Sequence, residues 1–171
     1  IREFTNKNNI FKDVQKLNVI LASKIYNMIN EDKSKVNNSQ AYQKLLLEFS
    51  VFLEPKMDIS KYALAEIYTF EKIYGTAFRI FDSIPDKSFF SLPANLKKLD
   101  IIKSSSMNIE YKTLLFKITN VWPDNKFVLY RLANYYKSKS LYHKSLKIYK
   151  KILDHYDYNN HDLFLYASNL D

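Results

Sequence analysis

Apolar residues recur three and four positions apart along most of this chain, and this spacing constrains its fold more than any other feature. Such a period places apolar side chains on one face of an α-helix, whereas a half-buried strand would show alternation. Proline and clusters of polar residues interrupt the pattern at intervals, so we expect an all-α chain of about nine helices. The first helix is expected over about residues 10–30, after a polar segment. Its apolar stripe consists of Ile10, Val14, Leu17, Leu21, Ile25 and Met28.

The same residue types return after 68 positions, which is twice 34. The matching pairs are Leu64 and Leu132, Ala65 and Ala133, Tyr68 and Tyr136, Tyr74 and Tyr142, Ala77 and Ser145, and Phe81 and Tyr149. A middle unit over residues 92–123 keeps the apolar phase and ends at Pro123. Residues 163–170 repeat types found 34 positions earlier, so we expect a capping helix there. The pattern therefore predicts repeated helical hairpins.

The composition excludes several classes of protein. The 171 residues include one Gly, no Cys and three His. Loops that cradle phosphates or dinucleotides need several glycines, because their backbone takes positive φ angles. A thiolate nucleophile or thiolate zinc site needs cysteine. No residues are framed as a catalytic arrangement, so we expect no enzyme, no cofactor and no metal site.

A helix–turn–helix unit of 34 residues resembles the tetratricopeptide repeat. Residues 126–157 match the family pattern best, residues 58–86 nearly as well, and residues 92–123 through period, apolar phase and the closing proline. The resemblance implies antiparallel helix hairpins stacked as a right-handed solenoid. It covers about three repeats and a capping helix over residues 58–171. An ordinary helical bundle with coincident spacing is the alternative.

The chain departs from the family pattern at several positions. Ala65, Leu99 and Ala133 stand where the family usually has Gly, and Ser145 stands where it usually has Ala. Tyr111 stands where a small residue is usual, and its bulk is expected to splay its helix pair. The middle unit is therefore the least regular.

Two parts of the chain are expected: an N-terminal helical hairpin over residues 1–56, as a diverged repeat or packing helices, and a repeat domain over residues 57–171. The chain begins with Ile1 rather than Met, so we expect a soluble domain excised from a longer protein. A membrane tether or export signal upstream is compatible with this. No apolar run is long enough to cross a membrane. The compartment and oligomeric state stay open.

The resemblance implies a concave groove, because the first helix of each tetratricopeptide unit lines a surface that binds a partner segment. Its aromatic side chains would be typical anchors for another protein. The implied groove residues are Tyr62, Glu66, Phe70, Leu96, Phe127, Tyr130, Asn134, Lys137 and Phe164. The alternative is that the N-terminal helices or the cap cover these aromatic residues.

The net positive charge of the chain is confined to one segment. The chain has 26 Lys and Arg against 18 Asp and Glu, a net charge of +8. The segment between Asp124 and Asp154 contains eight bases and no acid, so it accounts for all of that charge. Four of these bases form a basic face on the predicted eighth helix: Lys144, Lys147, Lys150 and Lys151. Such a face suits an acidic protein or an anionic surface, although a solvated helix face is the alternative.

Nucleic acid is a less favoured partner for this segment. The neighbouring tyrosines, Tyr136, Tyr142 and Tyr149, are expected to be used in packing, which leaves no platform for stacked bases. His155 and His161 stand among acidic residues, which is conceivable as a metal site but more typical of a polar turn. The stripe of the first helix could pair with another chain or pack on its own repeats.

The sequence as a whole predicts a non-enzymatic adaptor or scaffold that binds another protein in an aromatic-lined groove. The alternative function is binding of an anionic surface, membrane or nucleic acid, through residues 126–151.

Overall fold

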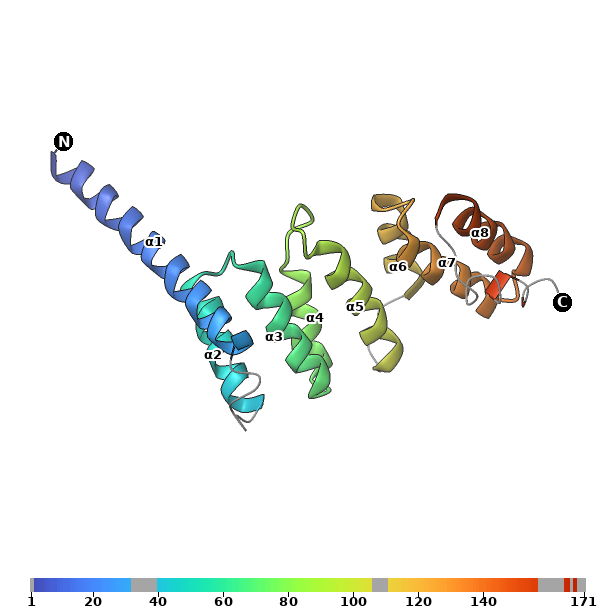
Figure 1. Ribbon diagram of the computed structural model, residues 1–171, viewed down its shortest axis with the longest axis horizontal. Helices are drawn as coiled ribbons and strands as arrows, with labels where there is room; N and C mark the ends of the chain where they lie inside the picture. The colour runs from blue at the N-terminus through green and yellow to red at the C-terminus, as the bar shows by residue number, and fades with distance from the viewer. Residues whose placement is uncertain (1, 32–39, 106–110, 157–164, 167, 169–171) are drawn as a thin grey trace. The chain divides into compact units, whose positions relative to one another are not determined.

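The computed structural model describes residues 2–31, 40–105, 111–156, 165–166 and 168. These residues contain eight helices and no strand, which confirms the all-α prediction (Figure 1). The helices are α1 (Arg2–Glu31), α2 (Gln40–Leu53), α3 (Asp58–Phe70), α4 (Tyr74–Asp82), α5 (Ser91–Ser104), α6 (Tyr111–Val121), α7 (Lys126–Ser138) and α8 (Tyr142–His155). The predicted capping helix falls largely on residues outside the described ranges.

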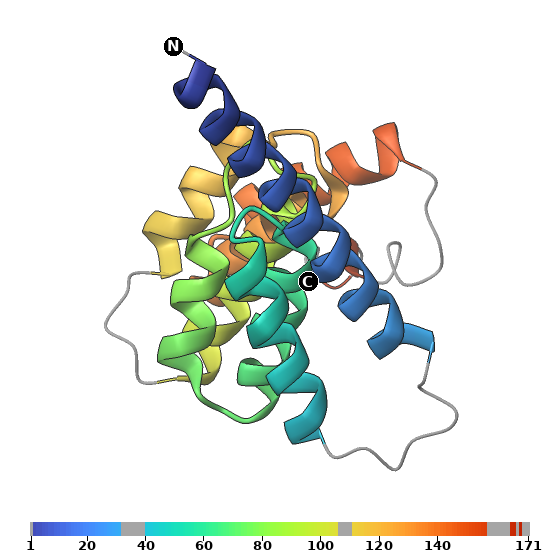
Figure 2. The same cartoon turned by 90° about the vertical axis from the view of Figure 1, so that its left-hand side faces the viewer.

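The chain divides into two compact units, the N-terminal unit (Ile1–Ile101) and the C-terminal unit (Ile102–Asp171). In the N-terminal unit α1 packs on α2, α2 on α3 and α3 on α4. In the C-terminal unit α6 packs on α7 and α7 on α8. Helix α1 has 30 residues and α2 has 14, so α1 runs past the end of α2 (Figure 2).

Small side chains lie where the helices of each repeated hairpin cross. Ala65 of α3 and Ala77 of α4 have no exposed surface, and the same holds for Ala133 of α7 and Ser145 of α8. The Ser145 hydroxyl donates to the Ala133 carbonyl oxygen at 3.0 Å, so its polar group is satisfied inside the crossing. Small residues at a crossing let helix axes approach to about 8–10 Å.

The turns inside these two hairpins are alike. Lys72 and Ser140, which stand 68 positions apart in the chain, are the described non-glycine residues with positive φ angles, 62° and 56°. In each turn the next amide donates to the helix carbonyl five residues before it, with an N···O distance of 2.9 Å in both. This bond is typical of a Schellman turn, whose left-handed residue is usually glycine. The single glycine, Gly75, lies inside α4 instead.

Replacing Lys72 or Ser140 with Gly should stabilise the protein. A residue with a β-carbon in the left-handed region costs about 1–2 kcal/mol, and the entropy that glycine loses on folding offsets part of this gain. We expect each variant to raise the free energy of unfolding by about 1 kcal/mol in urea titrations followed by circular dichroism. Lys117→Gly, inside α6, is the control and should lower it by about 1 kcal/mol. A turn variant that behaves like this control would contradict the left-handed conformation.

Candidate functional site

Four of the predicted groove residues lie in the N-terminal unit, and Tyr62 is the most firmly held of them. Its ring packs against the rings of Phe81 and Phe90, with centroid distances of 5.5 Å in both cases. Burial raises the pKa of Tyr62, and the negative charge of Glu66 raises that pKa further. Tyr62 therefore belongs to the packing of its own unit as much as to its surface.

The other three residues differ in how much surface they present. The Glu66 carboxylate pairs with the Lys97 ammonium at 2.8 Å, in a half-exposed ion pair that links α3 to α5. Leu96 is half-buried. Phe70, the last residue of α3, is 77% exposed. Phe70 is thus the largest apolar contact that these four residues offer to a partner.

Four further groove residues lie on α7 in the C-terminal unit. The side chain of Asn125 caps this helix, since its Oδ1 accepts from the amides of Phe127 and Val128 at 3.0 and 3.3 Å. The cap fixes the start of α7 and with it the position of Phe127, which is 67% exposed. The ring of Tyr130, in contrast, lies 6.2 Å from that of Tyr149 and is half-buried.

The polar groove residues of α7 already have partners inside the unit. The Tyr149 hydroxyl donates to Asn134 Oδ1 at 2.8 Å. The Lys137 ammonium donates to the hydroxyl and the carbonyl oxygen of Ser168, at 2.9 and 3.2 Å. A carboxylate of a partner would have to compete with these bonds. Asn134 and Lys137 are therefore not favoured as ligands for a partner's carboxylate.

Part of the C-terminal segment packs on the α7–α8 hairpin. Leu165 and Tyr166 lie against the cluster formed by Leu129, Ala133, Tyr149 and Ile152. Burial raises the pKa of Tyr149 in this cluster. Tyr130 packs on the same cluster, and its buried hydroxyl has no hydrogen-bond partner among the described residues. Phe164, the ninth predicted groove residue, lies outside the described residues.

The four lysines of α8 share one side of the helix, which we call the α8 lysine face: Lys144, Lys147, Lys150 and Lys151. At 100° per residue they fall within about 120° of its circumference. The first three are exposed. Lys151 is half-buried and pairs with Asp124 at 2.7 Å, and this bond holds the pKa of Asp124 below its usual value. The Lys144 ammonium lies 5.6 Å from the centre of the Tyr136 ring.

The tyrosines near this face differ in burial. Tyr149 is buried and Tyr136 half-buried, as the packing interpretation expected, but Tyr142 is exposed at the start of α8. The structure thus leaves one tyrosine ring of α8 exposed where the sequence had predicted packing, and at 100° per residue this ring lies about 80° or more from each lysine of the face. A single ring is too little for the successive stacking that single-stranded nucleic acid requires.

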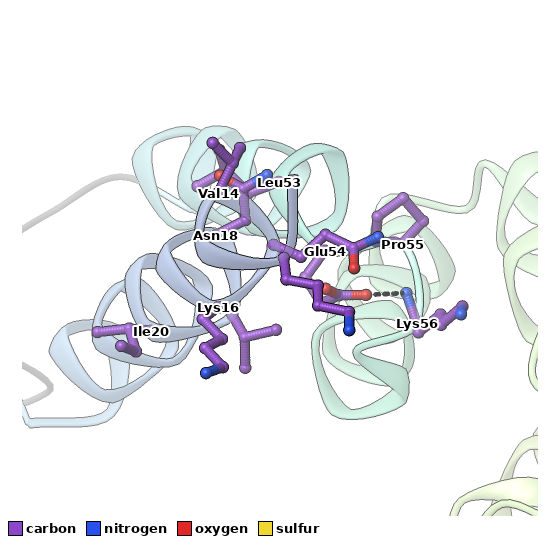
Figure 3. A pocket seen from close by; sticks show the side chains of 11 residues that line it. Val14, Lys16, Asn18, Ile20, Leu53, Glu54, Pro55 and Lys56 are labelled. Atoms are coloured by element: carbon purple, nitrogen blue, oxygen red, sulfur yellow. Dashed lines mark hydrogen bonds between the residues drawn. The ribbon is translucent and has the colours of Figure 1, made fainter. Parts of the chain in front are cut away.

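A hollow of about 780 Å³ lies between α1 and the turn that joins α2 to α3 (Figure 3). Its lining combines apolar side chains with three lysines and Glu54, whose Oε1 accepts from the Lys56 amide at 3.0 Å. The lining residues are Lys12, Val14, Gln15, Lys16, Asn18, Val19, Ile20, Leu53, Glu54, Pro55 and Lys56. None of these lining side chains carries a hydroxyl, imidazole or thiol.

Other kinds of site receive no support in the described part of the chain. No group of three His, Asp or Glu side chains lies close enough there to hold a metal ion. The Nδ1 atom of His155 lies 3.0 Å from the Lys151 carbonyl oxygen, as in a helix-end contact, and His161 lies outside the described residues. None of the described helices is both long and apolar enough to span a bilayer.

Helix α2 carries an exposed apolar row that its sequence pattern alone does not mark as a surface. Tyr42, Leu45, Phe49 and Phe52 are all exposed, although Leu47 on the opposite side is buried. The available signal was that α2 is apolar on nearly all sides. A helix of that kind is normally buried all round, and here one side is open.

Comparison with known proteins gave no match to a protein-family model and no significant match to a curated protein.

Proposed function

We propose that this chain is a non-enzymatic protein–protein interaction module, an adaptor or scaffold built from tetratricopeptide-like helical hairpins. One observation carries the proposal: Phe70 and Phe127, on the first helices of the two repeated hairpins, are 77% and 67% exposed. Burying a phenylalanine side chain gains about 1.5–3 kcal/mol, so each ring is by itself a strong anchor for a partner of its own unit. The repetition of the left-handed turn at 68 residues supports the tetratricopeptide-like class.

In each unit the remaining described groove residues are already held by contacts of their own. Tyr62 and Tyr130 are held by ring contacts, while the Glu66 carboxylate and the Asn134 amide oxygen have partners in their own units. Side chains whose rotamers are already fixed lose little entropy when a partner binds. A partner would thus bury the exposed phenylalanine of either unit without rearranging the groove residues of that unit.

The test is affinity capture from an extract of the native cell, with the intact chain compared with a Phe70→Ala/Phe127→Ala variant. We expect at least a tenfold loss of the captured partner, because a central aromatic anchor is worth about 2 kcal/mol or more. Tyr130 is left intact, since it packs on the core and its loss would confound binding with stability.

Phe89→Ala is the matched control for this test. Phe89 is 90% exposed and lies outside α3 and α7, in the connection between α4 and α5. It should leave capture unchanged. Equal capture by the double variant and the intact chain would refute the proposed site. If the Phe89→Ala control lost as much partner as the double variant, the captured protein would be binding exposed apolar side chains without specificity.

A second candidate function is binding to an anionic surface through the α8 lysine face. It is favoured by the exposure of Lys144, Lys147 and Lys150 on one side of a single helix. Each lysine near an anionic bilayer contributes about 1 kcal/mol, and a row on one side can act together. The two functions are compatible, because the lysines lie on α8 and the exposed phenylalanines on α3 and α7.

A further inference from the structure

The first hairpin exposes an apolar surface that neither proposed function uses. We call it the α1–α2 apolar face, and its side chains are between 40% and 78% exposed. It consists of Val14, Leu17, Leu21 and Met28 of α1 and Tyr42, Leu45, Phe49 and Phe52 of α2. Soluble monomers seldom expose so many large apolar side chains together, and such patches mark interaction sites.

The way α1 rests on α2 leaves this face open. Ala22 of α1 is fully buried, and its carbonyl oxygen accepts from the Ser50 hydroxyl of α2 at 3.3 Å. Ala22 thus marks the side of α1 that contacts α2. At 100° per residue, the stripe that contains Leu17 and Leu21 lies roughly 100° round the helix from that side. Helix α1 is therefore apolar over a wide arc, of which α2 covers one part.

The α2 row lies away from α3. Helix α2 meets α3 and its C-terminal end through the bonds from Lys44 to Glu71 and from Tyr68 to Glu48, at 2.7 and 2.6 Å. The centre of the exposed α2 row lies about 100° round the helix from these contacts. Because α1 and α2 are antiparallel, rotation away from their contact line brings the α1 stripe and the α2 row to the same side of the hairpin. The two helices thus present one continuous apolar face.

Two opposite charges flank the α1 stripe. Asp13 and Lys24 are both exposed, and neither has a hydrogen bond or ion pair among the described residues. They stand eleven positions apart, or about 16 Å along the helix. A two-fold axis midway between them, near Asn18, would bring Asp13 of one copy beside Lys24 of another. By symmetry the pair would contain two such contacts. The same axis places Leu17 within one residue of Leu21 of the second copy.

We propose that two copies of this chain associate through the α1–α2 apolar face, with α1 of one copy antiparallel to α1 of the other. The charge pattern selects this arrangement, since a parallel pairing would place Asp13 against Asp13 and Lys24 against Lys24. The eight side chains offer roughly 800 Å² of apolar surface, which is about what each partner contributes to a stable interface. Such an interface is isologous, as in most soluble homodimers.

The length of α1 agrees with this pairing. Helix α1 has 30 residues and its N-terminal half extends past α2 (Figure 1). In an antiparallel pair this half lies alongside the C-terminal half of α1 of the second copy. The association does not depend on partner binding at Phe70 and Phe127, so either proposal can fail without the other.

Sedimentation velocity on the full chain, over about 1–100 μM, tests the proposal, because interfaces of this size have dissociation constants in the micromolar range or below. The sedimentation of the intact chain should correspond to an apparent mass twice that of one chain. Asp13→Lys and Lys24→Asp should each weaken dimerisation at least tenfold. The double variant, which exchanges the two charges, should restore the dimerisation constant to within about threefold, as a double-mutant cycle of directly paired residues requires.

Two further variants separate the interface from folding. Leu17→Asp should give a monomer with unchanged helical circular dichroism, because Leu17 is exposed in the isolated chain. Val121→Asp, at an exposed apolar residue of α6, should leave dimerisation unchanged. A monomeric intact chain would overturn the proposal. The proposal would also be overturned if neither single charge reversal weakened dimerisation, or if the double variant dimerised no more strongly than the single variants.

Discussion

Replacing Tyr149 with Ala should lower the free energy of unfolding of the C-terminal unit by about 3–5 kcal/mol. Tyr149 is 1% exposed and lies in the cluster with Leu129, Ala133 and Ile152. The substitution leaves a cavity at the centre of the α7–α8 hairpin and removes the hydrogen bond to Asn134. Urea titration followed by tyrosine fluorescence and circular dichroism would measure the loss.

Tyr149→Phe is the matched control, because it keeps the ring and removes only the hydroxyl. We expect it to cost about 1 kcal/mol, the usual net value of one hydrogen bond. Hydrogen exchange should show faster exchange in α7 and α8 of the Ala variant, with α3 and α4 unchanged, since these helices belong to the other compact unit. A loss below about 1 kcal/mol in the Ala variant would contradict the packing of Tyr149.

Replacing Lys144, Lys147 and Lys150 with Gln should weaken binding to vesicles that contain phosphatidylserine by about 100-fold. The estimate follows from about 1 kcal/mol for each lysine near an anionic bilayer. Lys151 is left intact because its ammonium is paired with Asp124. Binding would be measured by vesicle co-sedimentation at about 50 mM salt, where surface charges are little screened.

Three exposed lysines of the N-terminal unit provide the control with the same change of net charge: Lys56, Lys72 and Lys87. Their replacement with Gln should change binding by less than threefold, because these lysines lie in three separate connections between helices and form no row that could act together. Equal loss in both triple variants would mean that net charge, rather than the α8 lysine face, determines binding. No binding by the intact chain would remove this second candidate function.

Most of the helices could be predicted from the sequence because their signals are local. The period of the apolar residues and the interrupting breakers predict helices over about residues 40–54, 59–71 and 74–84, and the observed ends of α2, α3 and α4 lie within about two residues of these bounds. The first helix is an exception, since it begins at Arg2 and not near Ile10. Polar residues are compatible with a helix, so polarity alone does not mark where one begins.

Which side of each helix is exposed was harder to predict than the presence of the helix. Periodicity shows that one face is apolar, but it does not show which part of a wide apolar arc has a neighbour. Leu17 and Phe49 lie in such arcs and are exposed. The pairing of Glu66 with Lys97, and of Lys137 with Ser168, depends on segments about 30 residues apart in the chain. No local pattern in the sequence encodes those contacts.

Site-specific photo-crosslinking in the native cell tests most directly whether this chain binds another protein through α3 and α7. p-Benzoylphenylalanine would replace Phe70, Phe127 or, as the control, Phe89, all of which are exposed. We expect the same crosslinked partner from positions 70 and 127 and none from position 89. Crosslinks from position 89 alone, or none from either α3 or α7, would contradict this expectation.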